Sequence, residues 1–467
     1  MALTRSLAGA VAGQPDRVGK ESPRGEESGP GADVVIVGAG FTGLAAAYEF
    51  CRQGLRPLVL EAADSPGGLA GTFTFADGVE IEKFYHHWFA SDVHIQELIH
   101  ELGLQSSVLT LPSRTGLYLN RRHWKFASTA DLLAMTAIPL WDRLRLGFSV
   151  LEARRQKDWR RLEELNVREW LEPRCGTKAY RTIWEPLLRA KFGSLAEEVN
   201  AAWMWKKLAL RGGTRDGQGH EQMLYFSGGF GELARKLAKQ IETMGGRILY
   251  QTPVFGAEGD GKGLACLTTR HGAVRGNHYL FTPAFPVVAE ILEGTADNAY
   301  LQALRRVRYL GNICLVLRLK RSLSETYWLN VNDPGFPFVG VIEHTNLHGP
   351  ASYGGSHIVY LSRYVPPDDP AWGLSDEERL AEALPHLCRM FPEFQPDWIL
   401  DHCTWSTPHA QPVTERGYSR YLPGSQMPFR NASLCTMAQV YPEDRGTNYA
   451  VREGRKVARQ IAAVRSV

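Results

Sequence analysis

One stretch near the start of the sequence, from Asp33 to Gly68, constrains the fold of this chain more than any other. It begins with an apolar run, Val34 to Val37, which is typical of a buried parallel strand. A G-x-G-x-x-G turn follows, then a predicted helix over residues 44–53, a second apolar run over 57–60 and an acid, Glu61. Strand, glycine turn, helix, strand and acid, in this order, are typical of a nucleotide-binding βαβ unit.

The three glycines of this turn, Gly38, Gly40 and Gly43, have separate tasks in such a unit. The first permits the tight turn, the second lets the backbone approach a pyrophosphate, and the third lets the helix pack on the strand. The N-terminus of the helix offers N–H groups and partial positive charge to that pyrophosphate. Glu61 can accept hydrogen bonds from both ribose hydroxyls, and its charge would repel a 2′-phosphate. The pattern predicts a bound dinucleotide; an ordinary βαβ unit without a ligand is the alternative.

A second glycine pair, Gly67 and Gly68, comes soon after Glu61 and would bring another piece of backbone against the ligand. With this pair, the stretch resembles the flavoprotein superfamily of amine oxidases, phytoene desaturases, protoporphyrinogen oxidases and UDP-galactopyranose mutases. Two later segments are similar to the same superfamily: the one that runs from Gly228 to Val254, and the loop and helix that follow Leu434. The resemblance implies that the cofactor is flavin adenine dinucleotide (FAD) and not NAD.

The resemblance also implies which residues contact the FAD. They come from the glycine turn, the acid, the second glycine pair, the Val254 strand and the C-terminal loop: Gly38, Gly40, Phe41, Thr42, Gly43, Glu61, Ala62, Gly67, Gly68, Leu69, Val254, Gln439, Asp444, Gly446 and Asn448. Two of them depart from the superfamily pattern. Many members have an arginine where this chain has Leu69, and relatives often have an acid where it has Gln439.

The expected fold class is α/β, with two domains that are each assembled from separate pieces of chain. A Rossmann-type FAD-binding domain takes residues 31–80, 222–290 and 425–467, and a substrate-binding domain takes 81–221 and 291–424. The substrate-binding domain combines a mixed or antiparallel sheet with a helical cap. Residues 1–30, rich in Gly, Ser, Pro, Arg and Glu, predict a disordered tail. No second strand–GxGxxG–helix unit occurs, so a separate NAD(P)H domain is not expected.

Composition excludes several other classes of protein. The chain has 467 residues, of which 44% are hydrophobic and 22% charged, as in a globular enzyme. Its net charge of +3 is too small to argue for nucleic acid. The seven cysteines are scattered without a C-x-x-C pair, so neither a metal site nor a disulfide framework is indicated, and a reducing cytoplasm is the simple interpretation. No apolar run reaches 18 residues. Oligomeric state is not predicted.

The segment directly after the flavin motif holds the candidate catalytic residues: Lys83, Tyr85, His86 and His87. In the similar flavoproteins, the segment at this place crosses the face of the flavin ring. Two adjacent imidazoles beside a lysine and a tyrosine are costly to bury without a purpose, which favours contact with flavin or substrate. The alternative is that the aromatic residues of this segment are core and that its histidines are satisfied polar groups.

A long helical region, about residues 130–207, contains an apolar stretch beside several arginines. We expect it to form a cap over the active site; lying on a membrane surface is the less favoured alternative. Trp184, Arg189 and Lys191 in this region suit a small-molecule substrate that carries phosphate or carboxylate, because such groups stack rings and pair with anions. They become the catalytic candidates if the Lys83–Trp88 segment does not line the site.

Taken together, the sequence favours an FAD-dependent oxidoreductase that takes hydride from a small organic substrate. A redox-neutral flavin mutase or isomerase acting on a nucleotide sugar is the alternative. The sequence does not name the substrate or the electron acceptor.

Overall fold

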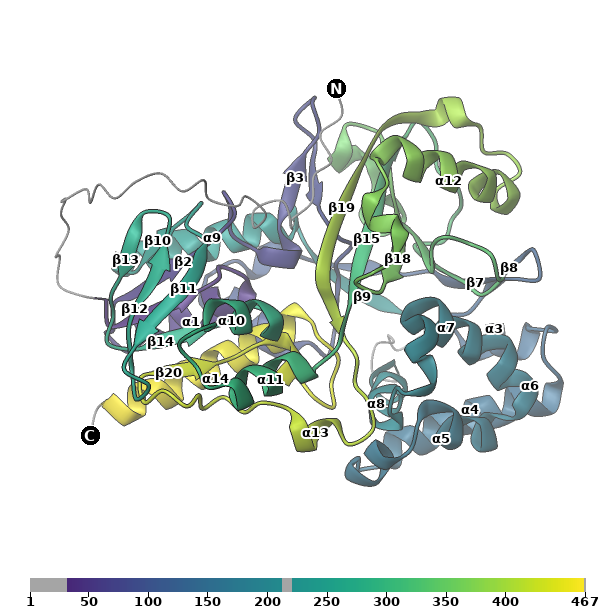
Figure 1. The fold of residues 1–467 in the computed structure, drawn as a ribbon. Helices are drawn as coiled ribbons and strands as arrows, with labels where there is room; N and C mark the ends of the chain where they lie inside the picture. Colours follow the sequence, from purple (N-terminus) through teal and green to yellow (C-terminus); the bar gives the residue numbers. More distant parts are fainter. Residues whose placement is uncertain (1–31, 212–220, 466–467) are drawn as a thin grey trace.

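A five-stranded parallel sheet forms one end of the molecule in the computed structural model, which describes residues 32–211 and 221–465 (Figure 1). Its strand order is β10-β2-β1-β14-β20. The bounds are Arg247–Leu249, Pro57–Leu60, Val34–Val37, Tyr279–Phe281 and Ala432–Leu434. The sequence places β1 and β2 correctly, and the predicted tail of residues 1–30 lies outside the described residues.

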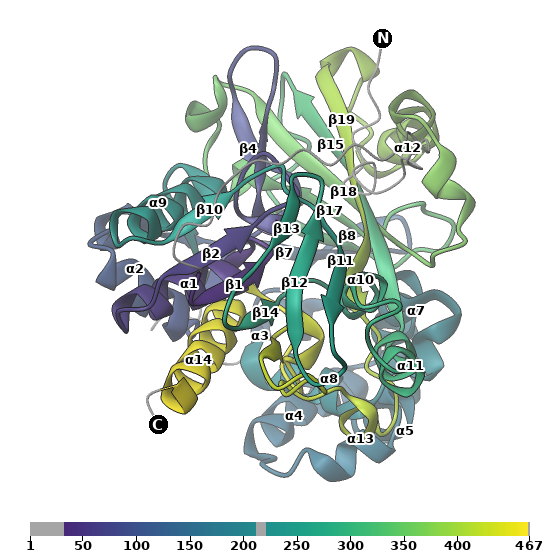
Figure 2. The same cartoon turned by 60° about the vertical axis from the view of Figure 1, so that its left-hand side comes forward.

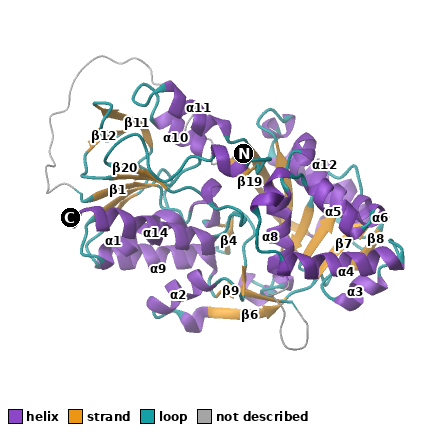
Figure 3. Ribbon diagram, turned by 90° about the horizontal axis from the view of Figure 1, so that it is seen from below, coloured by secondary structure: helices purple, strands orange, loops and turns teal. Residues whose placement is uncertain are grey.

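Two further layers cover this sheet, one on each face (Figure 3). Strand β1 turns Val34 and Ile36 toward the helices of one layer and Val35 and Val37 toward the other layer, as the alternation of a strand requires. The first layer holds α1 (Phe41–Arg52), α9 (Gly229–Thr243) and α14 (Thr447–Arg465). The second layer holds β11 (Val254–Gly259), β12 (Leu264–Thr269), β13 (Gly272–Val274), α10 (Phe285–Ile291) and α11 (Asn298–Arg306).

A seven-stranded sheet forms the other end of the molecule, with order β19-β15-β18-β17-β16-β7-β8. Its strands pair antiparallel except for β16 and β7, so the sheet is mixed, as expected. The bounds, in chain order, are Thr115–Leu119, Arg122–Lys125, Tyr309–Leu319, Trp328–Val331, Gly340–Glu343, His357–Val365 and Ile399–Pro412. Helix α12 (Asp376–Met390) packs on this sheet and begins with a capping box of Ser375 and Glu378.

The helical cap lies below both sheets in Figure 2. It comprises α3 (Thr129–Ala134), α4 (Leu140–Arg155), α5 (Val167–Cys175), α6 (Thr177–Ala179), α7 (Glu185–Phe192) and α8 (Ala201–Arg211). Two small sheets join the large ones: β3 (Thr72–Thr74) with β4 (Glu80–Glu82), and β9 (Gln222–Phe226) between β5 (Trp88–Phe89) and β6 (Val108–Pro112). The division into two discontinuous domains stays a prediction.

The start of helix α2 (Val93–Glu101) depends on a residue far along the chain. No side chain next to it in the sequence accepts a hydrogen bond from its first turn. The amide of Ile95 donates instead to Oδ1 of Asn448 at 3.1 Å, on α14. A buried helix end requires a partner for its amides, and here the partner comes from far along the chain. None of the helices described is long and apolar enough to cross a membrane.

Candidate active site

The glycine turn after β1 has the close contacts that exclude side chains at two of its three glycines. Gly38 has a φ of +100°, which L side chains rarely adopt. A Cβ on Gly43 would lie 2.0 Å from the carbonyl oxygen of Gly38. A Cβ on Gly40, in contrast, would meet no atom within 4 Å. The turn is therefore closed on the strand side and open at Gly40, in front of the first turn of α1.

The N-terminus of α1 fits a pyrophosphate. Phe41, Thr42 and Gly43 are buried, and Gly40 precedes them without any capping hydrogen bond from a side chain among the described residues. Buried amides at a helix start need an acceptor, and an anion is the ligand that such a start prefers. These residues fit FAD, which the absence of a capping side chain and the open space at Gly40 both support.

Glu61 and the second glycine pair lie against this turn. The carboxylate of Glu61 accepts hydrogen bonds from the amides of Ala39 (2.6 Å) and Ala63 (2.8 Å). The amide of Gly67 donates to the carbonyl of Ala39 at 2.9 Å, and a Cβ on Gly68 would lie 3.2 Å from Cα of Gly40.

The strand that leads to Val254 also reaches this place. The amide of Thr252 donates to the carbonyl of Glu61 at 2.7 Å, two residues before Val254 begins β11. Ala62 follows Glu61 directly, while Leu69 packs its side chain among the apolar residues of the neighbouring cluster around Phe73. The structure thus brings the N-terminal candidate residues together in one place.

The C-terminal candidates for FAD contact differ in whether their side chains already have protein partners. Both ends of the Gln439 side chain have protein partners: Oε1 accepts from the amide of Thr436 at 2.8 Å, and Nε2 donates to the carbonyl of Pro423 at 2.9 Å. Asn448 holds α2 through Ile95. Contact of either residue with FAD stays a prediction. Gly446 is exposed and lies directly before α14.

The segment from Lys83 to Trp88 is held by all three motifs that resemble the flavoproteins. The amide of Lys83 donates to the carbonyl of Gly71 at 3.0 Å, beside the second glycine pair. The rings of His86 and Trp88 lie 5.2 and 4.3 Å from that of Phe230, at the start of α9. Nε1 of Trp88 donates to Oγ1 of Thr447 at 2.6 Å, at the start of α14.

The polar side chains of this segment have different partners. Nζ of Lys83 lies 4.6 Å above the ring of Trp405, the hydroxyl of Tyr85 is 3.1 Å from Oγ of Ser362, and Nδ1 of His87 is 2.9 Å from the hydroxyl of Tyr327. These partners belong to the seven-stranded mixed sheet and to the segment directly before its strand β16. The four candidates thus lie between the two ends of the molecule.

His86 has the chemistry of a neutral base. Its Nδ1 lies 2.6 Å from the carbonyl oxygen of Phe84. Because a carbonyl only accepts, Nδ1 carries the proton and Nε2 is left with its lone pair. Nε2 has no hydrogen-bond partner among the described residues. Burial lowers the pKa of His86 to about 4, the Phe84 carbonyl opposes this shift, and the positive charge of Arg445 adds to it.

A cluster of charges surrounds Asp444 in the C-terminal loop. Lys207 Nζ lies 2.5 Å and Lys191 Nζ 4.0 Å from its Oδ2, and Arg445 follows it in the chain. Burial opposes ionisation of Asp444, but these three cations outweigh burial and hold its pKa well below the ordinary value. Burial and the neighbouring charge of Lys207 lower the pKa of Lys191, against the pull of Asp444.

Tyr364 connects this cluster to the Lys83–Trp88 segment. Nη2 of Arg445 donates to the Tyr364 hydroxyl at 3.0 Å, and Nζ of Lys191 lies 5.2 Å from the centre of the Tyr364 ring. The charge of Arg445 acts on the pKa of both His86 and Tyr85. The helical cap, the mixed sheet, the C-terminal loop and the candidate catalytic segment therefore meet around Arg445.

The three cap candidates lie in different environments. Lys191 belongs to the cluster just described. Arg189 is exposed and pairs with Glu185 at 3.0 Å, on the outside of α7. Trp184 is buried in the core of the cap, where its Nε1 has no hydrogen-bond partner among the described residues. Sequence reasoning named Lys191 as a basic group of the cap that pairs with anions, whereas nothing in the local sequence marked Tyr364.

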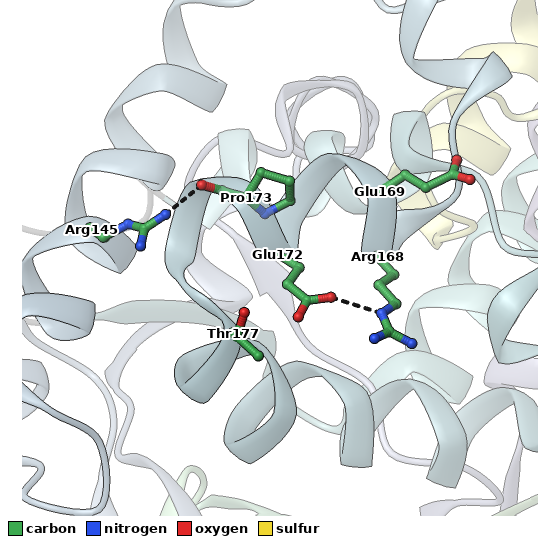
Figure 4. Close-up of a pocket in the computed structure, with 6 residues that line it drawn as sticks. All are labelled: Arg145, Arg168, Glu169, Glu172, Pro173 and Thr177. Atoms are coloured by element: carbon green, nitrogen blue, oxygen red, sulfur yellow. Dashed lines mark hydrogen bonds and ion pairs between the residues drawn. The ribbon is translucent and has the colours of Figure 1, made fainter.

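A separate hollow of about 410 Å³ lies in the helical cap (Figure 4). It is lined by Arg145, Arg168, Glu169, Glu172, Pro173 and Thr177. The charged groups there are already paired: Arg168 donates to Glu172 at 2.7 Å and Arg145 donates to the Pro173 carbonyl at 2.5 Å. None of these residues is a candidate for FAD or for catalysis, so the hollow is distinct from the site around Arg445.

Residues 41–462 match the family model of flavin-containing amine oxidoreductases. The chain belongs to this family. A protein of Mycobacterium tuberculosis named as a flavin-containing monoamine oxidase, AofH, is 27% identical over 257 residues, which are 52% of this chain and 55% of that protein. The chain spans about half the length of the curated relatives it matches.

Two solved structures share the fold of this family member. Cyclohexylamine oxidase from Brevibacterium oxydans has a TM-score of 0.72 at 18% identity, over 94% of this chain and 100% of that one. Reduced UDP-galactopyranose mutase has a TM-score of 0.71 at 13% identity, over 93% and 94%. At such identities the likeness shows the fold alone. The family match confirms the predicted superfamily and the FAD cofactor, and the solved structures agree with the predicted α/β fold class.

Proposed function

We propose that this flavoprotein oxidises a small organic molecule that carries a carboxylate or phosphate. Bound FAD would supply the acceptor of a hydride, which carries both electrons of the oxidation and which no side chain can accept. The residues of the chain then have to bind the molecule, orient it, exclude water and take up a proton.

The observation that carries the proposal is the charge imbalance around Arg445. Lys207 and Arg445 carry two positive charges against the single carboxylate of Asp444, and Lys191 adds a third when it is protonated, against its lowered pKa. Positive charge is therefore in excess in a place that is partly buried. Cations are costly to hold in such a place unless an anion compensates them. A carboxylate or phosphate of the substrate would supply that compensation.

His86 is the proposed base of the reaction. It is neutral at pH 7, its proton is held on Nδ1 by the Phe84 carbonyl, and Nε2 can accept a proton from the substrate. Lys83 and Tyr85 support the same segment from the Trp405 and Ser362 side. We expect His86→Ala to retain FAD and to slow flavin reduction by roughly 10²-fold, the scale of a lost general base.

Matched pairs of compounds test the anion preference. Each pair has the same oxidisable amine or alcohol, with and without a carboxylate or phosphate. Loss of the oxidised-flavin absorbance is followed without oxygen, for wild type, Lys207→Met and a control, Lys236→Met, on the exposed side of α9. The proposal expects the anionic members to saturate at lower concentration, by about tenfold, and only Lys207→Met to remove that advantage. Equal saturation by the neutral members, or loss of the advantage in Lys236→Met, would contradict it.

The same cations also suit the pyrophosphate of a nucleotide sugar, which keeps a redox-neutral mutase as the second candidate. The two functions differ in their need for electrons. An oxidase or dehydrogenase works on substrate with oxidised flavin, whereas a mutase requires flavin that has been reduced beforehand. Product formation only after prior reduction with dithionite would favour the mutase.

A further inference from the structure

Helix α4 in the helical cap presents large apolar side chains to solvent. Along one face it carries an apolar stripe, which we define as Leu140, Trp141, Leu144, Phe148 and Leu151. Leu140, Leu144, Phe148 and Leu151 are spaced three or four positions apart, and Trp141 lies three positions before Leu144, so all five share one side of the helix. Trp141 is 70% and Phe148 68% exposed, and Leu133 of α3 extends the patch.

The stripe is concentrated and not scattered. With Leu133 it accounts for six of the eleven large apolar side chains that are exposed among the described residues. Single exposed apolar residues are ordinary, but a contiguous patch marks a surface that another body covers. The opposite face of α4, with Leu146, Ser149 and Ala153, is already buried against α5 and α8. The stripe is therefore not the face of α4 that packs into the core of the cap.

Positive charge follows the stripe along the chain. Residues 143–161 include seven Arg or Lys and two Asp or Glu, an excess of five positive charges. Five of these cations follow the stripe, are exposed, and pair with no carboxylate in the part of the chain that the structure describes; we call them the basic segment: Arg154, Arg155, Lys157, Arg160 and Arg161. Arg143 and Arg145 are instead held by backbone carbonyls of Ile138 and Pro173.

We propose that the apolar stripe docks the protein on the surface of a membrane that contains anionic lipids, with the basic segment on the lipid phosphates. Apolar side chains that enter the acyl boundary beside cations at headgroup level are the arrangement by which a helix lies in a membrane interface. A second copy of the chain would fit the apolar stripe as well, but it would bring two basic segments together, and their repulsion opposes that pairing. Figures 1 and 2 place α4 at the outer edge of the cap, where a flat surface can approach it.

This inference does not depend on the proposed reaction. It concerns the outside of the cap, whereas the cation cluster of the candidate active site lies on its inner side, on α7 and α8. Binding to lipid can therefore be measured without any substrate.

Sedimentation of the FAD-loaded full chain with lipid vesicles tests the proposal. One set of vesicles is pure phosphatidylcholine, and the other contains a third of phosphatidylglycerol. We expect binding to the anionic vesicles that weakens with added salt. Trp141→Ser combined with Phe148→Ser should weaken it by about tenfold or more. Arg154→Gln combined with Arg155→Gln should reduce the preference for anionic vesicles.

A matched control separates docking from general stickiness. Phe255 and Leu400 are 58% and 50% exposed but lie far from α4 in the chain, on β11 and β19. Phe255→Ser with Leu400→Ser should bind vesicles as the wild type does, and thermal unfolding shows whether each variant is folded. Wild type that fails to sediment with either vesicle overturns the proposal. So does a stripe variant that binds normally, or a wild-type dimer that the stripe variant converts to a monomer.

Discussion

Gly40 and Gly43 belong to the same turn but are required for different reasons. A Cβ at Gly43 would collide with the Gly38 carbonyl at 2.0 Å, whereas a Cβ at Gly40 would enter open space in front of α1. We therefore expect Gly43→Ala to impair folding itself. Gly40→Ala should leave the stability of the FAD-free protein unchanged and weaken FAD binding by roughly tenfold or more, about 1.4 kcal/mol.

Two measurements check this pair of variants: thermal unfolding of the FAD-free protein, and titration with FAD. Gly147→Ala is the control, because Gly147 lies inside α4 with only Leu132 near its Cβ position, at 3.9 Å. Alanine in a helix interior should be neutral or stabilise by up to about 1 kcal/mol. Equal loss of stability in Gly40→Ala and Gly43→Ala would contradict the assignment of an open cofactor side at Gly40.

Burial of His86 makes stability depend on pH in the acid range. Its pKa falls from 6.5 to about 4 on folding, so the unfolded chain binds the proton more readily. Stability is therefore complete above pH 6.5 and is lost as the pH falls from 6.5 toward 4, by roughly 2 kcal/mol at pH 5. Urea unfolding at pH 7.5 and at pH 5 should show a smaller difference for His86→Gln than for wild type.

His344 provides the comparison for this measurement. Burial lowers the pKa of His344 to about 3, with smaller contributions from His348 and His87, so it acts in the same direction. His344→Gln should reduce the difference in unfolding free energy between pH 7.5 and pH 5 by a similar amount. The double variant should reduce that difference by the sum of both amounts. An unchanged acid dependence in His86→Gln would mean that this imidazole is protonated as easily in the fold as in the unfolded chain.

Among the elements, α14 is joined to α1 and α2 by one buried arginine. Nε of Arg455 donates to the buried Glu49 on α1 at 3.0 Å, and its Nη2 donates to Glu101 on α2 at 2.6 and 2.8 Å. Without Arg455, the buried Glu49 keeps only the exposed Arg459 and Arg52 as partners among the described residues, so its charge is compensated less well. Arg455→Met should therefore cost roughly 3 kcal/mol of unfolding free energy.

Arg459 is the matched control for this prediction. It also bonds Glu49, at 2.9 Å, but its side chain is 59% exposed. Because water screens such a pair, Arg459→Met should cost about 1 kcal/mol or less. Chemical unfolding of both variants gives the comparison, and a larger loss in Arg459→Met would show that burial does not govern this cluster.

The elements that sequence could predict are those whose cause is local. The βαβ unit is formed within about thirty residues, and its glycines are required by contacts inside the same turn. The Lys83–Trp88 segment was placed by the continuity of the chain after the second glycine pair. The partner at the start of α2 was not predictable, because the amide of Ile95 donates to Asn448, which lies 353 positions further along the chain. Likewise, the hydrogen bonds of Gln439 to Thr436 and Pro423 cannot be seen in a motif, and its contact with the cofactor stays a prediction.

At the scale of the whole molecule, the described sheets include one parallel sheet with a glycine turn, and the second large sheet is mixed. The described part of the chain therefore has one site that is suited to a dinucleotide, and we identify no second site of this kind there. We expect NADPH to reduce the flavin slowly and without saturation. Stopped-flow measurement checks this, and reduction at tens per second with a saturating dependence on NADPH would contradict it.

The site around Arg445 could be predicted only in part at this scale. Basic residues beside tryptophans indicated an anion near the cap, but Lys191, Tyr364 and Asp444 come from three elements whose relative placement depends on the whole fold. A sequence motif carries no information on how these three elements are placed relative to one another, since each element alone is an ordinary helix, strand or loop.

The strand order β10-β2-β1-β14-β20 also has a consequence for the order of synthesis. Strand β1 leaves the ribosome early, but its neighbour β14 comes after the whole helical cap, and β20 follows only after the mixed sheet. The sheet that presents the glycine turn therefore stays incomplete during most of translation, while the cap can already fold. We therefore expect firm capture of FAD only by a chain made through β20, so a chain interrupted earlier should be released without its flavin.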